Sequence, residues 1–305
     1  MVFLKKNKQM KIVLIIAMSL LLINCNPVNE NNDSFSFVFF GDTRDATGDN
    51  IDHFRGACEA ISTLDSIEFV VSPGDTDPLD SVLYTLQKYI SKDIVWYPVV
   101  GNHEAETAED MVWIRNHNKD GNTLPNIVNK GPLSCIETTY SFDYKNTHFV
   151  IINEYSNDTC DDCTKGDIPD FLYNWLQDDL KKTIKENIIV FGHEPAYPLP
   201  DMESQRYRHV HDCLNQFPES RDRFVELLQE YNVLAYGVGH THNYSIVKMN
   251  NLWHIDAAHS RGLADMGSRS TFIKITINGN QVNFETYRLN YDSGKYEIAD
   301  IGSLN

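Results

Sequence analysis

Basic residues are scarce in this 305-residue chain, because 26 lysines and arginines stand against 43 aspartates and glutamates, for a net charge of −17 at pH 7. An acidic protein repels nucleic acid at long range, whereas nucleic-acid binders present a basic face. We therefore expect no nucleic-acid partner. The sequence also lacks an internal repeat, a domain linker and coiled-coil heptads, while 42% of its residues are hydrophobic. This composition indicates a globular protein with a large buried core.

No hydrophobic run in the sequence is long enough to cross a bilayer comfortably. The N-terminal run, Ile12 to Ile23, has only twelve residues and follows a group of lysines, which is typical of a signal peptide. We predict a signal peptide over residues 1–24, a polar tether over 25–34 and one domain over 35–305. Leu22-Ile23-Asn24-Cys25 resembles a bacterial lipobox, so we expect a lipid anchor at Cys25 and an exported envelope lipoprotein on the periplasmic or cell-surface side. Asn24 departs from the usual small residue, which leaves plain secretion or an uncleaved anchor open.

Cysteine is also rare, with six residues in all. An oxidising compartment permits disulfides, but the odd number that follows Cys25 leaves at least one cysteine unpaired if every bridge is internal. Cys58 is the expected free one because it lies in a probable helix. Cys160 and Cys163 have the spacing of a redox motif, but they lie in an acidic loop, so we predict a loop staple.

Apolar runs bounded by Gly, Asp and Asn alternate with helical patterns along the chain. Such runs are typical of buried strands, and the alternation favours an α/β fold with helices outside the sheet. The C-terminal part, Tyr244 to Tyr287, is richer in strand patterns and suggests a second sheet. The predicted strands are Phe35 to Phe40, Phe69 to Val71, Ile94 to Val100, Phe149 to Ile152, Ile188 to Phe191 and Val233 to Val238, and the clearest helices are Leu79 to Ile90, Pro169 to Lys185 and Asp222 to Tyr231.

Three long segments show no clear periodicity. They cover residues 107–135, 155–167 and 195–218. Loops of this length often build or cover a site, although they also occur as surface insertions.

Possible metal ligands follow several of the predicted strands. Strand ends converge on one crevice in α/β sheets, so side chains placed there meet. Each cluster alone is weak evidence, since Gly-Asp after a strand is usually a turn. Together they offer only oxygen and imidazole donors, which suit Mn, Fe, Zn or Mg. The clusters are Gly41-Asp42, Gly74-Asp75, Gly101-Asn102-His103-Glu104, Gly192-His193 and Gly239-His240-Thr241-His242.

This ordered series resembles the calcineurin-like metallophosphoesterases over about residues 35–260. Gly-Asn-His-Glu and Gly-His-Thr-His match the family pattern fully. The resemblance implies a four-layer α/β/β/α sandwich of two mixed sheets flanked by helices, a dinuclear centre of divalent or trivalent metal ions, and hydrolysis of a small phosphate ester by a metal-activated water.

The resemblance also assigns roles to individual residues. Asp75 would bridge two metals, and His103 would act as the general acid with Glu104 orienting its ring. Of the other ligands, one metal would take Asp42 and His242, and the second would take Asn102, His193 and His240.

One position departs from the family pattern. Arg44 stands two residues after Asp42, where many members have a histidine ligand, and Pro78 stands where a purple acid phosphatase would supply a tyrosine. Arginine does not ligate a metal, so the first metal position has fewer protein ligands. Arg44 is either a clamp on the substrate phosphate or the partner of a nearby carboxylate, Asp45 or Asp77.

Two functions stay open at this point. The first is a phosphoesterase, and the second is a catalytically silent surface lipoprotein that binds metal or a phosphorylated ligand. Substrate, metal identity and oligomeric state are not given by the sequence. His259 and Arg261 are expected in a surface loop more readily than at the cleft, and Tyr197 either lines the pocket or packs against prolines.

Overall fold

The computed structural model describes residues 34–44 and 50–305. The predicted signal peptide and Cys25 therefore lie outside the described residues, as does Asp45. All described elements belong to one compact unit. None of its helices has the length and apolar character needed to span a bilayer.

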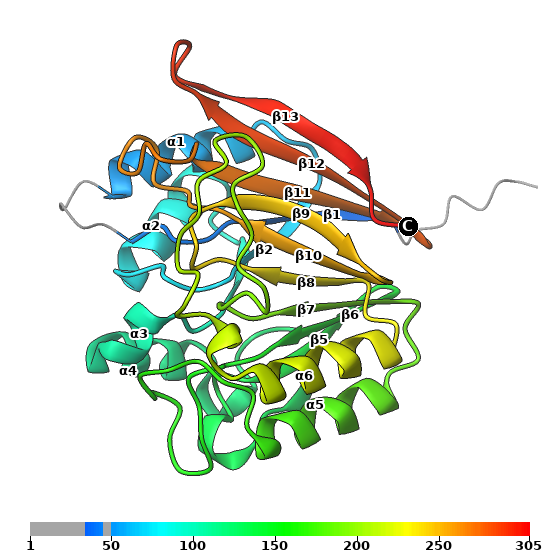
Figure 1. Ribbon diagram of the computed structural model, residues 1–305. Coiled ribbons are helices and arrows are strands. Elements are labelled where there is room, and N and C mark those ends of the chain that lie inside the picture. Colours follow the sequence, from blue (N-terminus) through cyan, green and yellow to red (C-terminus); the bar gives the residue numbers. More distant parts are fainter. Residues whose placement is uncertain (1–33, 45–49) are drawn as a thin grey trace, which may run out of the picture. The chain divides into compact units, whose positions relative to one another are not determined.

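Two mixed sheets form the centre of the fold (Figure 1). The first has the order β13-β12-β11-β1-β2-β3 and the second the order β4-β5-β6-β7-β8-β10-β9. The strands of the first sheet are β1 (Phe35–Phe39), β2 (Ile67–Ser72), β3 (Val95–Pro98), β11 (Thr271–Asn278), β12 (Gln281–Asn290) and β13 (Lys295–Ser303). Those of the second are β4 (Ile127–Lys130), β5 (Tyr140–Tyr144), β6 (Thr147–Ile151), β7 (Asn187–Phe191), β8 (Ala235–Val238), β9 (Tyr244–Met249) and β10 (Leu252–Ala257).

Helices cover the outer faces of both sheets. One apolar cluster joins the first sheet to α1, α2 and α4, and another joins the second sheet to α5 and α6. A third cluster fills the space between the sheets, where Phe37 and Phe69 stack with their ring centroids 5.1 Å apart. These layers confirm the predicted α/β/β/α sandwich. The helices are α1 (Asn50–Ile61), α2 (Leu79–Tyr89), α3 (Asn102–Glu106), α4 (Ala108–His117), α5 (Asp170–Lys182) and α6 (Pro218–Glu230).

The assignment of the C-terminal strands to the two sheets differs from the prediction. We expected the C-terminal part to form the second sheet, but β9 and β10 extend the second sheet while β11 to β13 join the first. The reason is the antiparallel pairing of β11 with β1, in which Phe37 lies opposite Ile275. Strand patterns in a sequence do not show which partner a strand chooses.

Two local expectations were also wrong. Residues 107–135 are not an irregular loop, because they contain α4 and β4, and α4 buries only Met111 and Ile114 and so gives little periodicity. The staple is not formed either: Cys160 and Cys163 are free thiols with their sulfur atoms 3.4 Å apart.

Candidate metal centre

All six predicted ligands lie at one edge of the sandwich, just beyond the carboxyl ends of parallel strands. Three follow β1, β2 and β3 of the first sheet, and three follow β7 and β8 of the second. The centre therefore spans both sheets. The ligands are Asp42, Asp75 and Asn102 from the first sheet and His193, His240 and His242 from the second.

The backbone at these positions is unusual. Asp42, Asp75, His240 and His242 all have positive φ, between 50° and 67°. Such conformations are uncommon for residues with a side chain and cluster at functional sites. Gly74, with φ of 89°, has no room for a Cβ because the His193 ring lies against it. The turn after β2 is therefore shaped around the histidine that arrives from the other sheet.

Four of the ligands form a compact group that we call the four-donor position: Asp75, Asn102, His193 and His240. Nε2 of His193 lies 3.2 Å from Nδ1 of His240, 3.3 Å from Oδ1 of Asn102 and 3.4 Å from Oδ1 of Asp75. Nδ1 of His240 is 3.1 Å from the same Asn102 oxygen. The ligand atoms of Asp75, His193 and His240 all fall within 4.8 Å of one another.

Backbone carbonyls determine which ring nitrogens carry hydrogen at this position. Nδ1 of His193 is 2.6 Å from the carbonyl oxygen of Pro73, and Nε2 of His240 is 3.1 Å from that of Asp212. A carbonyl accepts only, so these nitrogens donate and the opposite nitrogens hold lone pairs. The two lone pairs, a carboxylate and an amide oxygen then face one another. A cation at their centre satisfies all four, so the residues fit a metal ion.

Asp42 and His242 form the other half of the centre, which we call the two-donor position. Oδ1 of Asp42 lies 3.3 Å from Nε2 of His242 and has no hydrogen-bond partner, while Oδ2 accepts the backbone N–H of His240 at 3.0 Å. On the far side of the ring, Nδ1 of His242 is 3.0 Å from Oδ2 of Asp265. A carboxylate behind an imidazole leaves the other nitrogen free for a metal.

The electrostatics of the two aspartates also favour a cation. Burial opposes ionisation of Asp42, but His242, His193 and His240 lower its pKa to about 2. Burial, followed by the charges of Asp42 and Glu104, raises the pKa of Asp75 well above its usual value. A positive ion between the carboxylates removes this conflict.

His103 and Arg44 lie beside the ligands. Nη1 of Arg44 donates to Nε2 of His103 at 2.6 Å, and Nε of Arg44 is 3.8 Å from Oδ1 of Asp77. Burial and then the Arg44 charge lower the pKa of His103 to about 4. The ion pair with Asp77 is thus present, but the stronger contact of Arg44 is with the predicted general acid.

Glu104 has a different place from the one expected. Its carboxylate accepts the backbone N–H groups of Asp75 at 2.9 Å, Thr76 at 2.5 Å and Gly101 at 2.7 Å, rather than touching the His103 ring. It therefore joins the turns after β2 and β3. Its effect on His103 passes through the backbone, because Oδ1 of Asp75 accepts the His103 N–H at 3.1 Å.

Sequence reasoning missed two residues of this region. Glu154 follows β6, and its buried carboxylate accepts the backbone N–H groups of His193 and Glu194 at 2.8 and 2.7 Å, while burial raises its pKa to about 7. The strand-end rule would have found it. The same rule does not find Asp265, because this residue lies in the loop before β11 and does not directly follow a strand.

Three other sequence expectations concern residues near the centre. His259 is buried, with its Nε2 3.0 Å from the carbonyl oxygen of Ser268, and Arg261 is only 8% exposed. The expected surface loop at these two residues is therefore wrong. The Tyr197 hydroxyl lies 3.3 Å from Oδ1 of Asp222, and Arg221 covers its ring.

Comparisons with solved structures support the fold. GAP50, described as the anchor in the inner membrane complex of Plasmodium, is 17% identical and covers 89% of each chain with a TM-score of 0.59. A putative 5′-nucleotidase from Staphylococcus aureus is 12% identical over 88% of this chain and 54% of its own, with a TM-score of 0.49. The zinc complex of Vps29 from Entamoeba histolytica is 10% identical over 89% of this chain and all of its own, with a TM-score of 0.40.

No curated protein matches the chain significantly in sequence. At 17% identity, the likeness to GAP50 shows the fold alone. The family model described as calcineurin-like phosphoesterase, however, matches residues 35–244, which is most of the chain and includes all six ligands. The ordered clusters that resembled the family in sequence are thus one centre in space, and the chain belongs to the calcineurin-like phosphoesterase family.

Proposed function

We propose that the protein is a metal-dependent phosphoesterase that hydrolyses a phosphate mono- or diester. The observation that supports this most directly is the four-donor position, where lone pairs of His193 and His240 face each other at 3.2 Å and their tautomers are held by backbone carbonyls. Without a cation this arrangement is unfavourable, because no hydrogen lies between the acceptors. The arrangement therefore favours a bound metal ion.

The proposal assigns a role to each ligand. Asn102, His193 and His240 would hold one ion, Asp42 and His242 would hold the other, and Asp75 would contribute a carboxylate to both. Bound metals of this kind lower the pKa of a water and stabilise negative charge on the phosphoryl group.

The chain itself orients the substrate and handles the leaving-group proton. His103 is half-buried beside Asp75, with its Nε2 3.7 Å from Oδ2 of that residue, and is placed to give a proton to the leaving oxygen. Arg44 is partly exposed and can exchange its contact with His103 for a substrate oxygen. Binding of a phosphate by Arg44 thereby releases Nε2 of His103 for protonation.

Hydrolysis of aryl phosphate monoesters and diesters tests the proposal. Purified residues 26–305 are assayed after chelation and again after refilling with Mn, Zn, Fe or Mg. We expect metal-dependent turnover that falls at least about a hundredfold in His103→Ala and Asp75→Ala. Arg44→Ala is expected to raise KM or lower kcat with metal content unchanged. Absence of turnover with every metal, in folded protein that binds metal, would refute the esterase.

That negative outcome would favour a silent binding protein. The contact between Arg44 and Nε2 of His103 supports this second candidate, because it occupies the atom that a general acid needs. The solved structure of GAP50 is described as that of the anchor in the inner membrane complex of Plasmodium. Calorimetric binding of inorganic phosphate without ester turnover is the result that this candidate requires.

We also propose export and a lipid on Cys25, on the basis of the N-terminal sequence alone. Mass spectrometry of the mature N-terminus from whole cells tests this. A diacylglyceryl-modified Cys25 is expected, whereas an unmodified terminus at another residue would refute the anchor.

A further inference from the structure

The segment between β7 and α6, residues 195–217, contains almost no regular structure apart from the short 3₁₀ turn Leu214–Gln216. We call it the arm. Figure 1 shows this yellow-green segment rising from the second sheet beside the strands of the first. Its middle part holds several polar and charged residues, and two consecutive ones, Arg208 and His209, reach the metal centre.

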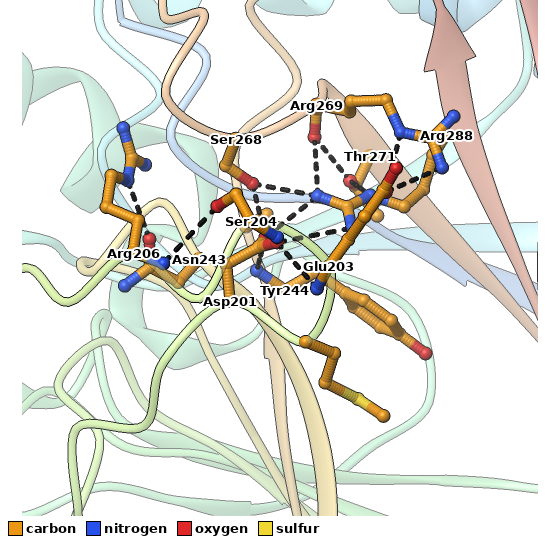
Figure 2. Close-up of polar contacts among 12 residues, drawn as sticks. Asp201, Glu203, Ser204, Arg206, Asn243, Tyr244, Ser268, Arg269, Thr271 and Arg288 are labelled. Carbon is orange, nitrogen blue, oxygen red and sulfur yellow. Dashed lines mark hydrogen bonds and ion pairs between the residues drawn. The ribbon is translucent and has the colours of Figure 1, made fainter.

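A buried ion pair anchors the arm to the C-terminal strands (Figure 2). Oδ2 of Asp201 lies 2.8 Å from Nη2 of Arg288 on β12, and it also accepts the Ser268 hydroxyl and the Tyr244 N–H. Oδ1 accepts the N–H groups of Glu203 and Ser204 at 3.0 and 2.8 Å. Every acceptor of this buried carboxylate is used, so the start of the arm is held firmly.

Arg206 holds the next part of the arm against the ligands. Its guanidinium donates to the Asn243 side chain at 2.9 Å, to Oδ1 of Asp265 at 2.7 Å and to the carbonyl oxygen of His242 at 2.9 Å. Figure 2 shows Arg206 pointing toward Asn243. With its donors used in this way, Arg206 acts as a positioning residue.

Arg208 differs from Arg206 in how its donors are used. Its side chain is 37% exposed, and its Nη1 contacts Nδ1 of His242 and lies 3.3 Å from Oδ2 of Asp265. When Nε2 of His242 serves a metal, Nδ1 carries the hydrogen and donates to Asp265. The ring then offers no acceptor to Arg208, so the guanidinium is left with donors for another anion.

Other guanidinium groups surround the same place. Arg44 lies against His103 beside the ligands. Burial lowers the pKa of Arg261, and the positive charges of Arg44 and Arg208 lower it further. Three arginines thus gather around the ligands of a strongly acidic protein, and an anion bound among them relieves their repulsion.

We propose that Arg208 binds a phosphate oxygen of the substrate and, together with Arg44, selects phosphate monoesters over diesters. This inference rests on the proposed function. A monoester is close to a dianion at neutral pH and offers three non-bridging oxygens, whereas a diester carries one charge and two such oxygens. Two metal positions and two guanidinium groups match the three non-bridging oxygens of a monoester. In a diester, the second ester group replaces one of these oxygens.

The variant Arg208→Gln tests the assignment in the metal-loaded protein. We expect the dissociation constant of inorganic phosphate, measured by calorimetry, to rise about tenfold to a hundredfold. The ratio of kcat/KM for an aryl monoester to that for an aryl diester is expected to fall by a similar factor. Metal content, measured by mass spectrometry, is expected to stay the same.

Two further variants complete the design. Arg208→Lys keeps the charge but not the planar fork, so an intermediate loss is expected, and it replaces Arg208→Gln if that variant does not fold. Arg223→Gln is the matched control, because the Arg223 side chain is 40% exposed and makes an ion pair with Asp170 of α5 at 2.6 Å. It is expected to leave phosphate affinity and the ester ratio unchanged.

Two results would overturn the inference. One is an unchanged phosphate affinity and ester ratio in both Arg208 variants, and the other is loss of metal, which would make Arg208 a support for His242. Absence of ester turnover in the unaltered protein would refute the proposed function instead, and the calorimetric comparison would still decide whether Arg208 binds phosphate.

Discussion

The two halves of the metal centre are oriented by different means. At the four-donor position, carbonyl oxygens of Pro73 and Asp212 hold the His193 and His240 rings. At the two-donor position, the His242 ring is held by the Asp265 side chain, which is itself shared with Arg206 and Arg208. A backbone carbonyl has no side-chain rotamers and does not titrate. A carboxylate on a loop can change its rotamer and can be protonated. The rings are therefore oriented by backbone acceptors at the first position and by a side-chain acceptor at the second.

The largest expected difference is between His193→Ala and His242→Ala. His193→Ala removes one of four donors and is expected to weaken the tightest metal site by more than about a hundredfold, above the range for residues that only support a ligand. His242→Ala is expected to remove only the weaker ion. Metal titration followed by mass spectrometry separates the two, and equal losses in both variants would contradict the comparison.

A smaller effect is expected for Asp265→Asn. The asparagine amide is a neutral acceptor and holds the N–H at Nδ1 of His242 less strongly than the Asp265 carboxylate does. Metal affinity at the two-donor position is therefore expected to fall about tenfold to a hundredfold. The four-donor position, whose rings are held by carbonyls, is expected to keep its ion. The same metal titration measures both sites, and loss of both ions would show that the positions are not independent.

The smallest effect on the centre is expected for His148, at the opposite end of the second sheet. Its ring lies between Asp143 and Asp179, with nitrogen to oxygen distances of 2.7 and 2.9 Å. Burial opposes protonation, but Asp179 and Asp143 raise the pKa of His148 above its usual value. Its charged form therefore stabilises the fold below the ordinary pKa of about 6.5, and this contribution is lost as pH rises through the folded pKa.

We expect His148→Gln to reduce the free energy of unfolding by roughly 1–3 kcal/mol at pH 5.5, and by less at pH 9. The side chains that contact the two carboxylates from neighbouring positions are Ser141, Asn129 and Lys185, and all three are kept in the variant. Urea unfolding at both pH values measures the difference, with turnover and metal content unchanged. A larger loss at pH 9 would contradict the assigned protonation state.

Much of the fold was predictable because its signals are local. Apolar runs such as Ile188 to Phe191 match β7, and the helix expected from Leu79 matches α2. The six candidate ligands were also predictable, since they stand within a few residues of a strand end in a fixed order. The pairing of strands was not predictable, because β11 pairs with β1, which lies more than two hundred residues earlier in the sequence.

The sequence by itself determined the candidate donors, because each stands in a short motif after an apolar run, and the resemblance carried by those motifs implied the family and the layers. Only the tertiary structure decided the tautomers of His193 and His240, the place of Asp265 behind His242, and the approach of Arg208 to the same ring. Each of these depends on atoms brought together from separate loops. Their positions are set by the anchor between Asp201 and Arg288 and by the packing of two sheets, and no periodicity within a single segment records such contacts.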